Sequence, residues 1–175
     1  MKKELGKNIL NGNFYDLGSG TGKGVLAFAL LRPFTKCIGI EFLENLFTLS
    51  NEMKFYYEKN IEDIFLANEN LFEDFYKHNT LTFINGDFLK ENWNDASIIL
   101  ANSTCFSHEL MTKIAIKSNN ECKQGTIIIT FTKKLSALNN QWQHFKSFKR
   151  LMTWGIATIY IYRKKKLKFF FLIKI

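Results

Sequence analysis

The stretch Tyr15–Gly24, YDLGSGTGKG, places three glycines at alternate positions among small residues, a pattern typical of loops that hold nucleotide-like ligands. A P-loop needs glycine five residues before its Gly-Lys pair and a hydroxyl residue directly after it. Here Leu17 and Gly24 stand at those places. A dinucleotide fingerprint needs glycine at the first, third and sixth positions, but the sixth position counted from Gly18 is Lys23. The pattern that fits is acidic-Leu-Gly-x-Gly-x-Gly, which brings bare backbone against a ligand without a phosphate to cradle.

Three further candidate ligand-binding positions stand at the ends of predicted strands. An adenosine ribose requires a carboxylate at the end of the second strand, about 20 residues after the loop, and Glu41 stands there. In NGDF, Asp87 is placed to accept from an adenine amino group and Phe88 to lie beside the ring. In LANSTCF, Asn102 falls at the central crevice, where open α/β sheets bind ligands. Each residue alone would pass as a turn or strand-end residue. Together with the glycine loop, the three positions predict an adenosine cofactor.

Alternating strands and helices must position these candidate ligand-binding residues. Buried strands are predicted at Asn13–Gly18, Lys36–Phe42, Thr80–Gly86, Ala96–Asn102 and Gly125–Thr132. Helices are predicted at Lys23–Leu31, ended by Pro33, at Leu43–His78 as one helix or two broken around Asn60 or Asn68–Asn70, and at His108–Cys122 with Ser107 as N-cap. Two extended segments, Phe145–Met152 and Gly155–Arg163, resemble an antiparallel pair. The expected fold is α/β, a doubly wound and mostly parallel sheet closed by an antiparallel C-terminal hairpin.

Composition limits the class of protein further. The 175 residues, 46% of them hydrophobic, suit one domain over residues 1–175, with 1–13 as a short lead-in and 164–175 as an atypical basic and apolar tail. A net charge of +8 favours an acidic partner such as nucleic acid or chromatin, although a lysine-rich surface is the alternative. Cysteines at 37, 105 and 122 share no metal-ligand spacing and indicate a reducing, intracellular location, with no metal predicted. No run reaches the roughly 20 apolar residues of a membrane span, so no membrane partner is predicted.

The sequence resembles the class I methyltransferases that use S-adenosylmethionine (SAM). More narrowly, it resembles the disruptor-of-telomeric-silencing family, the non-SET histone H3 lysine methyltransferases. The narrow similarity rests on DLGSGTGKGVL, GIE, GDFL followed by Trp93, SIILANSTCF and a distal WG before an aromatic strand, and it covers roughly residues 14–163. It implies a Rossmann-like fold, SAM as cofactor and a histone, a nucleosome or another basic protein as substrate. It also implies the nucleus in preference to the cytoplasm.

The resemblance implies a role for each matching position. Asp16 and the loop residues Gly18, Ser19, Gly20, Thr21 and Gly22 would line the methionine part of SAM, Glu41 the ribose, and Asp87 with Phe88 the adenine. Asn102 and Phe106 would border the channel through which a lysine reaches the methyl group. Tyr160, or else Tyr162, would close that channel. Trp154 would be either a channel wall or a core residue.

Three hypotheses stay open from the sequence. The first is a SAM-dependent protein-lysine N-methyltransferase acting on a histone or another basic protein. The second keeps the cofactor but takes a small molecule, RNA or a non-histone protein as acceptor. The third is a non-catalytic remnant of the fold that binds partners, an alternative suggested by the lead-in, which is short for the family. Cys105 is interpreted as a small buried residue, not as a nucleophile. The basic segment Tyr162–Lys168 is either a patch that contacts nucleic acid or a solvated chain end.

Overall fold

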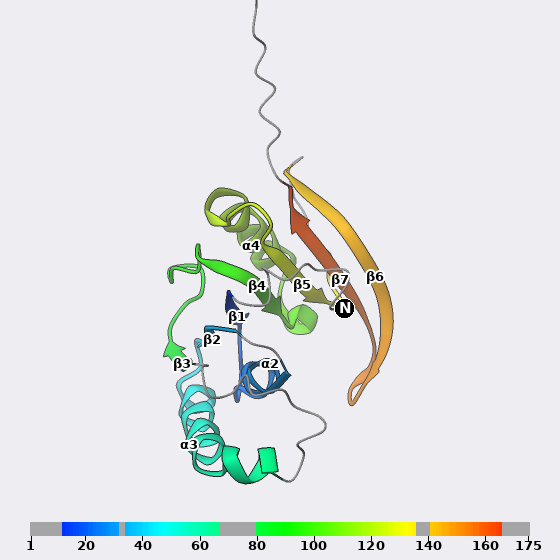
Figure 1. Cartoon of the computed structure of the whole chain (residues 1–175). Helices are drawn as coiled ribbons and strands as arrows, with labels where there is room; N and C mark the ends of the chain where they lie inside the picture. Colours follow the sequence, from blue (N-terminus) through cyan, green and yellow to red (C-terminus); the bar gives the residue numbers. More distant parts are fainter. Residues whose placement is uncertain (1–11, 32–33, 67–79, 136–140, 166–175) are drawn as a thin grey trace, which may run out of the picture.

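The computed structural model describes residues 12–31, 34–66, 80–135 and 141–165. The elements within these ranges follow in the order β1 (Asn13–Leu17), α2 (Lys23–Leu31), β2 (Lys36–Glu41), α3 (Glu44–Leu66), β3 (Thr80–Asn85), β4 (Ala96–Ala101), a 3₁₀ turn (Ser103–Cys105), α4 (His108–Glu121), β5 (Ile127–Phe131), β6 (Trp142–Met152) and β7 (Gly155–Lys164). The described strands form one sheet (Figure 1).

The sheet has seven strands in the order β3-β2-β1-β4-β5-β7-β6. Strands β1 to β5 pair in parallel, whereas β7 pairs antiparallel with β5 and with β6. The predicted fold class is therefore confirmed, including the closing hairpin. Because the strand order reverses between β1 and β4, the crevice for a ligand is expected at the carboxyl ends of these two strands.

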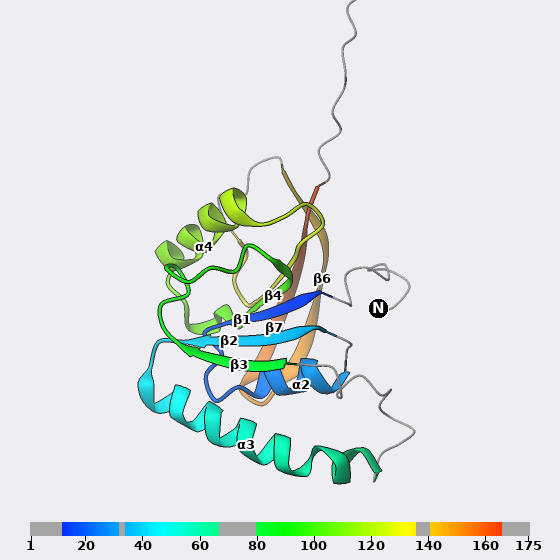
Figure 2. The same cartoon turned by 60° about the vertical axis from the view of Figure 1, so that its left-hand side comes forward.

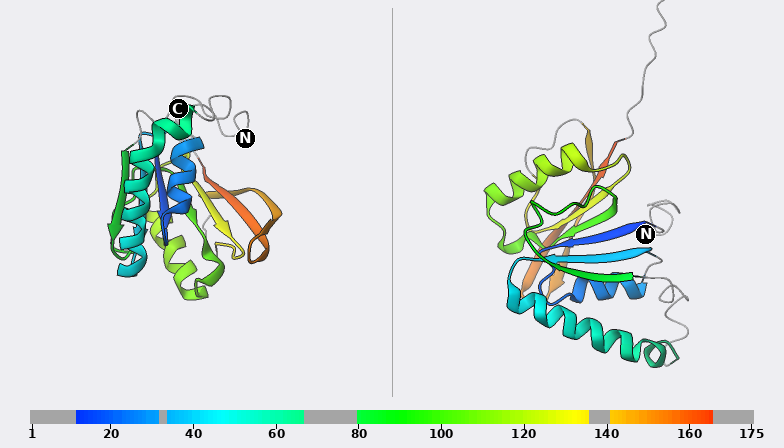
Figure 3. Two further views of the ribbon diagram at one scale, coloured as in Figure 1. Left: turned by 90° about the horizontal axis from the view of Figure 1, so that it is seen from below. Right: turned by 90° about the vertical axis from the view of Figure 1, so that its left-hand side faces the viewer.

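Helices cover both faces of the sheet, as the views in Figures 2 and 3 show. Helices α2 and α3 pack on one face, where Phe14 of β1 stacks on Phe28 of α2 with ring centroids 4.1 Å apart. Helix α4 covers the other face and buries Met111 and Ile114 against the sheet. Its N-cap is Ser107, as predicted, whose hydroxyl accepts from the backbone N–H of Leu110. Burial on both faces explains why the parallel strands are nearly continuous apolar runs.

The β6–β7 hairpin extends past the carboxyl edge of the parallel strands (Figure 1). The last residue of β5, Phe131, pairs with Ile159, so the first residues of β7 lie beyond the end of β5. Strand β6 begins at Trp142, three residues before the predicted start at Phe145. At the hairpin turn Trp154 is 52% exposed, which excludes the interpretation of Trp154 as a core residue.

Two other predictions differ from the structure or lie outside it. Helix α3 continues through Asn60, so the proposed break there is wrong; the side chain of Asn60 donates to the Tyr56 carbonyl one turn earlier. The alternative break at Asn68–Asn70, the lead-in over 1–11 and the tail over 166–175 lie outside the described residues. None of the helices in the described ranges combines the length and apolar content that crossing a membrane requires.

Candidate functional site

The glycine loop joins β1 to α2 and is held against β2. The backbone N–H groups of Gly18 and Ser19 both donate to the carbonyl oxygen of Ile40, at 2.9 and 3.1 Å. Gly18, Gly20 and Gly22 have φ angles of +74°, +55° and +81°, a region that residues with a Cβ rarely adopt. The alternating glycines are therefore a requirement of the backbone path, independent of any ligand.

The three glycines differ in what lies above them. A Cβ on Gly22 would stand 2.5 Å from the Phe83 ring, and a Cβ on Gly18 would stand 3.0 Å from the Phe106 ring. Gly20 has no atom within 4 Å of the same position. The loop is thus packed at both ends and open at its centre, which is the cradle that a ligand approaching the bare backbone needs.

The Glu41 carboxylate, at the end of β2, binds directly to this loop. Oε2 accepts from the Gly20 N–H at 2.8 Å and Oε1 accepts from the Leu43 N–H at 2.9 Å. The side chain is only 7% exposed. Each carboxylate oxygen has a further lone pair, so both can still accept from sugar hydroxyls. The structure therefore brings together the glycine loop and Glu41, as their spacing in the sequence predicted.

Asp16, in β1, lies beneath the loop, and its carboxylate faces the first turn of α2. It is 4% exposed, and its Oδ2 lies 2.5 Å from the position where Gly24 would carry a Cβ. Burial, and secondarily the negative charge of Glu41, raises the pKa of the Asp16 carboxyl to about 7. A buried acid of this kind favours a positively charged ligand group, because such a group stabilises its ionised form.

Ser19 and Thr21 contribute differently to the predicted cradle. The Ser19 hydroxyl oxygen is buried without a hydrogen-bond partner and lies 2.7 Å from the position where Gly39 would carry a Cβ. It points back toward β2, so the backbone of Ser19 is what can face a ligand. Thr21 is half-buried within the loop.

The turn after β3 is fixed by its own hydrogen bonds. Oδ1 of Asp87 accepts from the Leu89 N–H at 2.8 Å, and the Phe88 carbonyl accepts from the indole of the fully buried Trp93 at 2.7 Å. The Phe88 ring stacks on Phe106, with centroids 5.8 Å apart. Because Phe106 also contacts Gly18, an aromatic pair lies beside the start of the glycine loop.

Asn102 lies exposed at the end of β4, next to the end of β5. Its Oδ1 accepts from the Thr104 hydroxyl at 3.2 Å, and that hydroxyl lies 3.0 Å from the hydroxyl of Thr132. Thr132 adopts a φ of +65°, the one non-glycine positive φ in the described part of the chain. Sequence analysis did not identify Thr132, since no pattern marks a threonine that takes a left-handed turn.

The two candidate channel tyrosines occupy different environments on β7. Tyr160 pairs with Thr130, next to the end of β5, and is half-buried on the face that also carries Phe106. Tyr162 lies two residues further from the carboxyl edge and is 5% exposed, packed in the core beneath α4. The position at the edge favours Tyr160. Within the described ranges, no hydrogen bond or ring contact joins Tyr160 to Phe106 or Asn102; the nearest ring partner of Tyr160 on β6 is His144, with centroids 6.5 Å apart.

Known proteins share both the sequence pattern and the fold of this chain. Residues 5–158 match the profile of a family described as histone methylation protein DOT1. The chain belongs to the DOT1 family. The predicted family is thereby confirmed.

One curated relative of this DOT1-family chain is the H3 lysine-79 specific histone-lysine N-methyltransferase of Caenorhabditis elegans. The two are 31% identical over 122 residues, which are 70% of this chain but 12% of the relative. The similarity therefore concerns a small part of the longer protein.

Solved methyltransferase structures share the fold of the DOT1-family chain at low identity. They include magnesium protoporphyrin IX methyltransferase from Synechocystis PCC 6803 with bound SAM (TM-score 0.59, 12% identity, 90% of this chain and 72% of that one). TrmN from Thermus thermophilus is similar too (TM-score 0.60, 14% identity, 88% and 44%). A putative methyltransferase, yhhF, from Escherichia coli also matches (TM-score 0.58, 12% identity, 91% and 80%). At these identities the likeness shows the fold alone.

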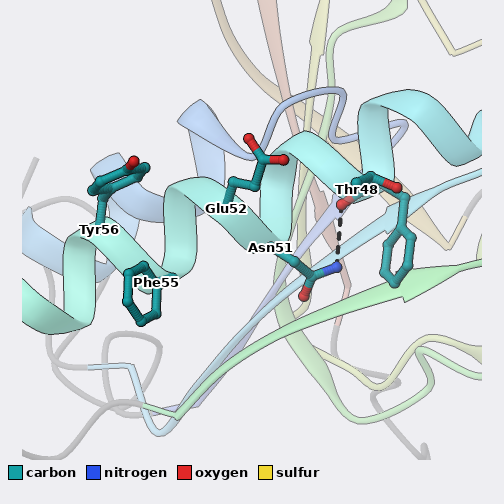
Figure 4. Close-up of a pocket in the computed structure, with 6 residues that line it drawn as sticks. Thr48, Asn51, Glu52, Phe55 and Tyr56 are labelled. Atoms are coloured by element: carbon teal, nitrogen blue, oxygen red, sulfur yellow. Dashed lines mark hydrogen bonds between the residues drawn. The ribbon is translucent and has the colours of Figure 1, made fainter.

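A separate pocket of about 500 Å³ lies on α3 of the DOT1-family chain, lined by Phe47, Thr48, Asn51, Glu52, Phe55 and Tyr56. Figure 4 shows that these side chains come from one helix, with the Asn51 amide donating to the Phe47 carbonyl at 3.1 Å. None of them belongs to the predicted site.

Two other predictions about side chains need correction. Lys164 is 7% exposed, and its ammonium donates to the carbonyls of Ser118 and Asn119 at 3.3 and 2.8 Å. Burial lowers its pKa. Lys164 is therefore unavailable to a phosphate, and part of the segment Tyr162–Lys168 lies outside the described residues. Cys105 is exposed, so its interpretation as a buried residue is wrong.

Proposed function

We propose that this chain is a SAM-dependent protein-lysine N-methyltransferase whose acceptor is a histone lysine. The observation that carries the proposal is the open glycine cradle at Gly20, whose backbone N–H is bound to the Glu41 carboxylate. The DOT1-family match and the 31% identity to a histone H3 lysine-79 enzyme support a histone acceptor.

The residues at the cradle fit the parts of SAM. The backbone of residues 18–22 would lie along its methionine part, where the buried carboxyl of Asp16 favours a positively charged ligand. Glu41 would accept from the ribose hydroxyls. Asp87 and Phe88 would hold the adenine, through a carboxylate acceptor and the side of a ring already stacked on Phe106.

Bound SAM supplies a methyl group carried on a sulfonium, and its carbon–sulfur bond breaks as the acceptor nitrogen bonds to the methyl carbon. The protein's task is therefore alignment. Asn102 would accept from the acceptor amine through Oδ1, in place of the Thr104 hydroxyl that it now accepts from. Phe106 and Tyr160 would form apolar walls, which lower the pKa of an entering lysine because they remove water from its ammonium.

Nucleic acid, the acidic partner that the net charge favours, would bind to β6. This edge strand exposes Lys146, Lys149 and Arg150, and it continues into the hairpin beyond the carboxyl edge of the sheet. We propose that these side chains contact DNA phosphates when the chain acts on a nucleosome, so that binding weakens steeply with salt. A nuclear location follows from a histone substrate.

Transfer of labelled methyl groups tests the proposal. The protein would be incubated with labelled SAM and nucleosomes, free histones, RNA or a small-molecule lysate fraction. Label on a histone lysine is the expected result. Label only on RNA or small molecules would contradict the histone acceptor, and SAM binding without transfer to any acceptor would contradict the enzymatic proposal.

Asn102→Ala is expected to lower kcat by about 100-fold, the scale typical of misaligned reactants. The affinity for S-adenosylhomocysteine should stay unchanged, because the side chain is placed at the acceptor side and not at the loop. Steady-state methylation and calorimetry measure the two effects. Asn94→Ala, at an exposed turn residue, is the matched control and should alter neither quantity. Lost cofactor affinity in Asn102→Ala would show that its role has been misassigned.

A further inference from the structure

Two lysines of the chain itself each contact a residue proposed to line the acceptor channel. They follow the last residue of β5 after the single residue Thr132. The ammonium of Lys133 donates to the backbone carbonyl of Phe106, and the ammonium of Lys134 lies 5.6 Å from the centroid of the Tyr160 ring. Neither forms a salt bridge with a carboxylate in the described part of the chain.

The backbone that presents these lysines is fixed. Thr132, with its φ of +65°, turns the chain sharply after β5. The Thr130 hydroxyl then donates to the Lys133 carbonyl at 2.7 Å, and the Lys133 N–H donates to the Phe131 carbonyl at 2.6 Å. Thr130 is also the residue that pairs with Tyr160. The turn therefore holds Lys134 at the carboxyl edge, where the acceptor lysine of a substrate must arrive.

The two lysines differ in freedom. Lys133 is half-buried, and its ammonium is held by a carbonyl. Lys134 is exposed, and among the described residues its ammonium lies over the face of the Tyr160 ring. A cation over an aromatic face at a partly exposed site is held only weakly, so the Lys134 side chain can leave that face readily.

We propose that the chain methylates its own Lys134, an inference that rests on the proposed methyltransferase function. Lys134 Nζ, once deprotonated, forms a bond to the methyl carbon while the carbon–sulfur bond breaks. The electron pair stays on sulfur in S-adenosylhomocysteine, and the proton passes to solvent. The product remains a cation, and methylated ammonium groups bind well to aromatic faces such as that of Tyr160.

Peptide mass mapping tests the inference. The full chain is incubated with methyl-labelled SAM without substrate, and nucleosomes are assayed in parallel with the same preparation. The expected label lies on Lys134, falls at least tenfold in Lys134→Arg and is unchanged in Lys123→Arg, an exposed lysine before β5. The fraction labelled per unit time should not change over a hundredfold dilution, since Lys134 lies over the Tyr160 of its own chain.

The outcomes separate the two proposals. Labelled nucleosomes with no label on Lys134, or labelling in proportion to protein concentration, would overturn self-methylation and leave the methyltransferase function intact. An absence of transfer to any acceptor would overturn both.

A measurement without turnover gives a second test. Lysines of the free protein are converted to ¹³C-dimethyl-lysines with formaldehyde and a reductant, and their methyl signals are recorded by NMR. The Lys134 signal should lie upfield because of the Tyr160 ring, return toward the exposed-lysine position in Tyr160→Leu, and shift when S-adenosylhomocysteine is added. A Lys134 signal indifferent to both changes would overturn the proposal.

Discussion

Gly20→Arg should abolish the binding of S-adenosylhomocysteine, with an affinity loss of at least about 100-fold, or roughly 3 kcal/mol. Gly20 is the loop residue with no atom within 4 Å of a Cβ position, and its N–H fixes the Glu41 carboxylate at 2.8 Å. An arginine there would fill the space in which a ligand lies and would offer its guanidinium to Glu41. Isothermal titration calorimetry measures the loss.

The control must separate occupation of the cradle from backbone strain. Gly20 has a φ of +55°, where a side chain costs roughly 1–2 kcal/mol. Gly125, before β5, has a φ of +89° and likewise no atom within 4 Å of a Cβ position. Gly125→Arg should therefore lose similar stability in urea unfolding and keep full cofactor affinity. Equal affinity loss in both variants would assign the effect to strain and would remove the cradle from the site.

Much of the fold could be predicted because a buried strand or helix shows an apolar pattern within its own segment of the sequence. Parallel strands covered on both faces must be apolar runs, so their positions are visible in the sequence. Helix α2 was predicted with its observed bounds, Lys23–Leu31, because a glycine loop precedes it and Pro33 follows. The start of β6 was missed for the opposite reason: an edge strand with most of its side chains exposed carries almost no apolar pattern.

The candidate site was predictable where it depends on motif spacing. The contact between Gly20 and Glu41 follows from a loop after one strand and a carboxylate after its neighbour. The positions of Lys133 and Lys134 were not predictable. They depend on the left-handed turn at Thr132 and on the register in which β7 pairs with β5. No pattern in the neighbouring sequence predicts either of these features.

Asp16→Asn should stabilise the free protein at pH 8, by up to about 4 kcal/mol. In the folded chain the Asp16 pKa is about 7, because burial and Glu41 oppose its charge, whereas its ordinary value is 3.8. Unfolding therefore releases a proton between these values, and the free energy of unfolding falls as pH rises from 3.8 through 7. Asparagine stays neutral and escapes this loss. Urea unfolding should show the gain at pH 8 and none near pH 3, with Asp63→Asn, at an exposed carboxylate of α3, unchanged at both.

The same substitution should weaken binding of S-adenosylhomocysteine, whose ammonium is positively charged below pH 8. A positive group near Asp16 favours the carboxylate, so wild-type affinity should rise between pH 6 and pH 8, with proton uptake by the buffer on binding. Calorimetry in two buffers of different ionisation heat measures that proton. In Asp16→Asn the affinity should be lower and independent of pH over this range. A wild-type affinity that does not change with pH would mean that Asp16 does not face the charged end of the ligand. The buried carboxyl thus links the two effects: the charge that destabilises the empty loop is the charge that the ligand neutralises.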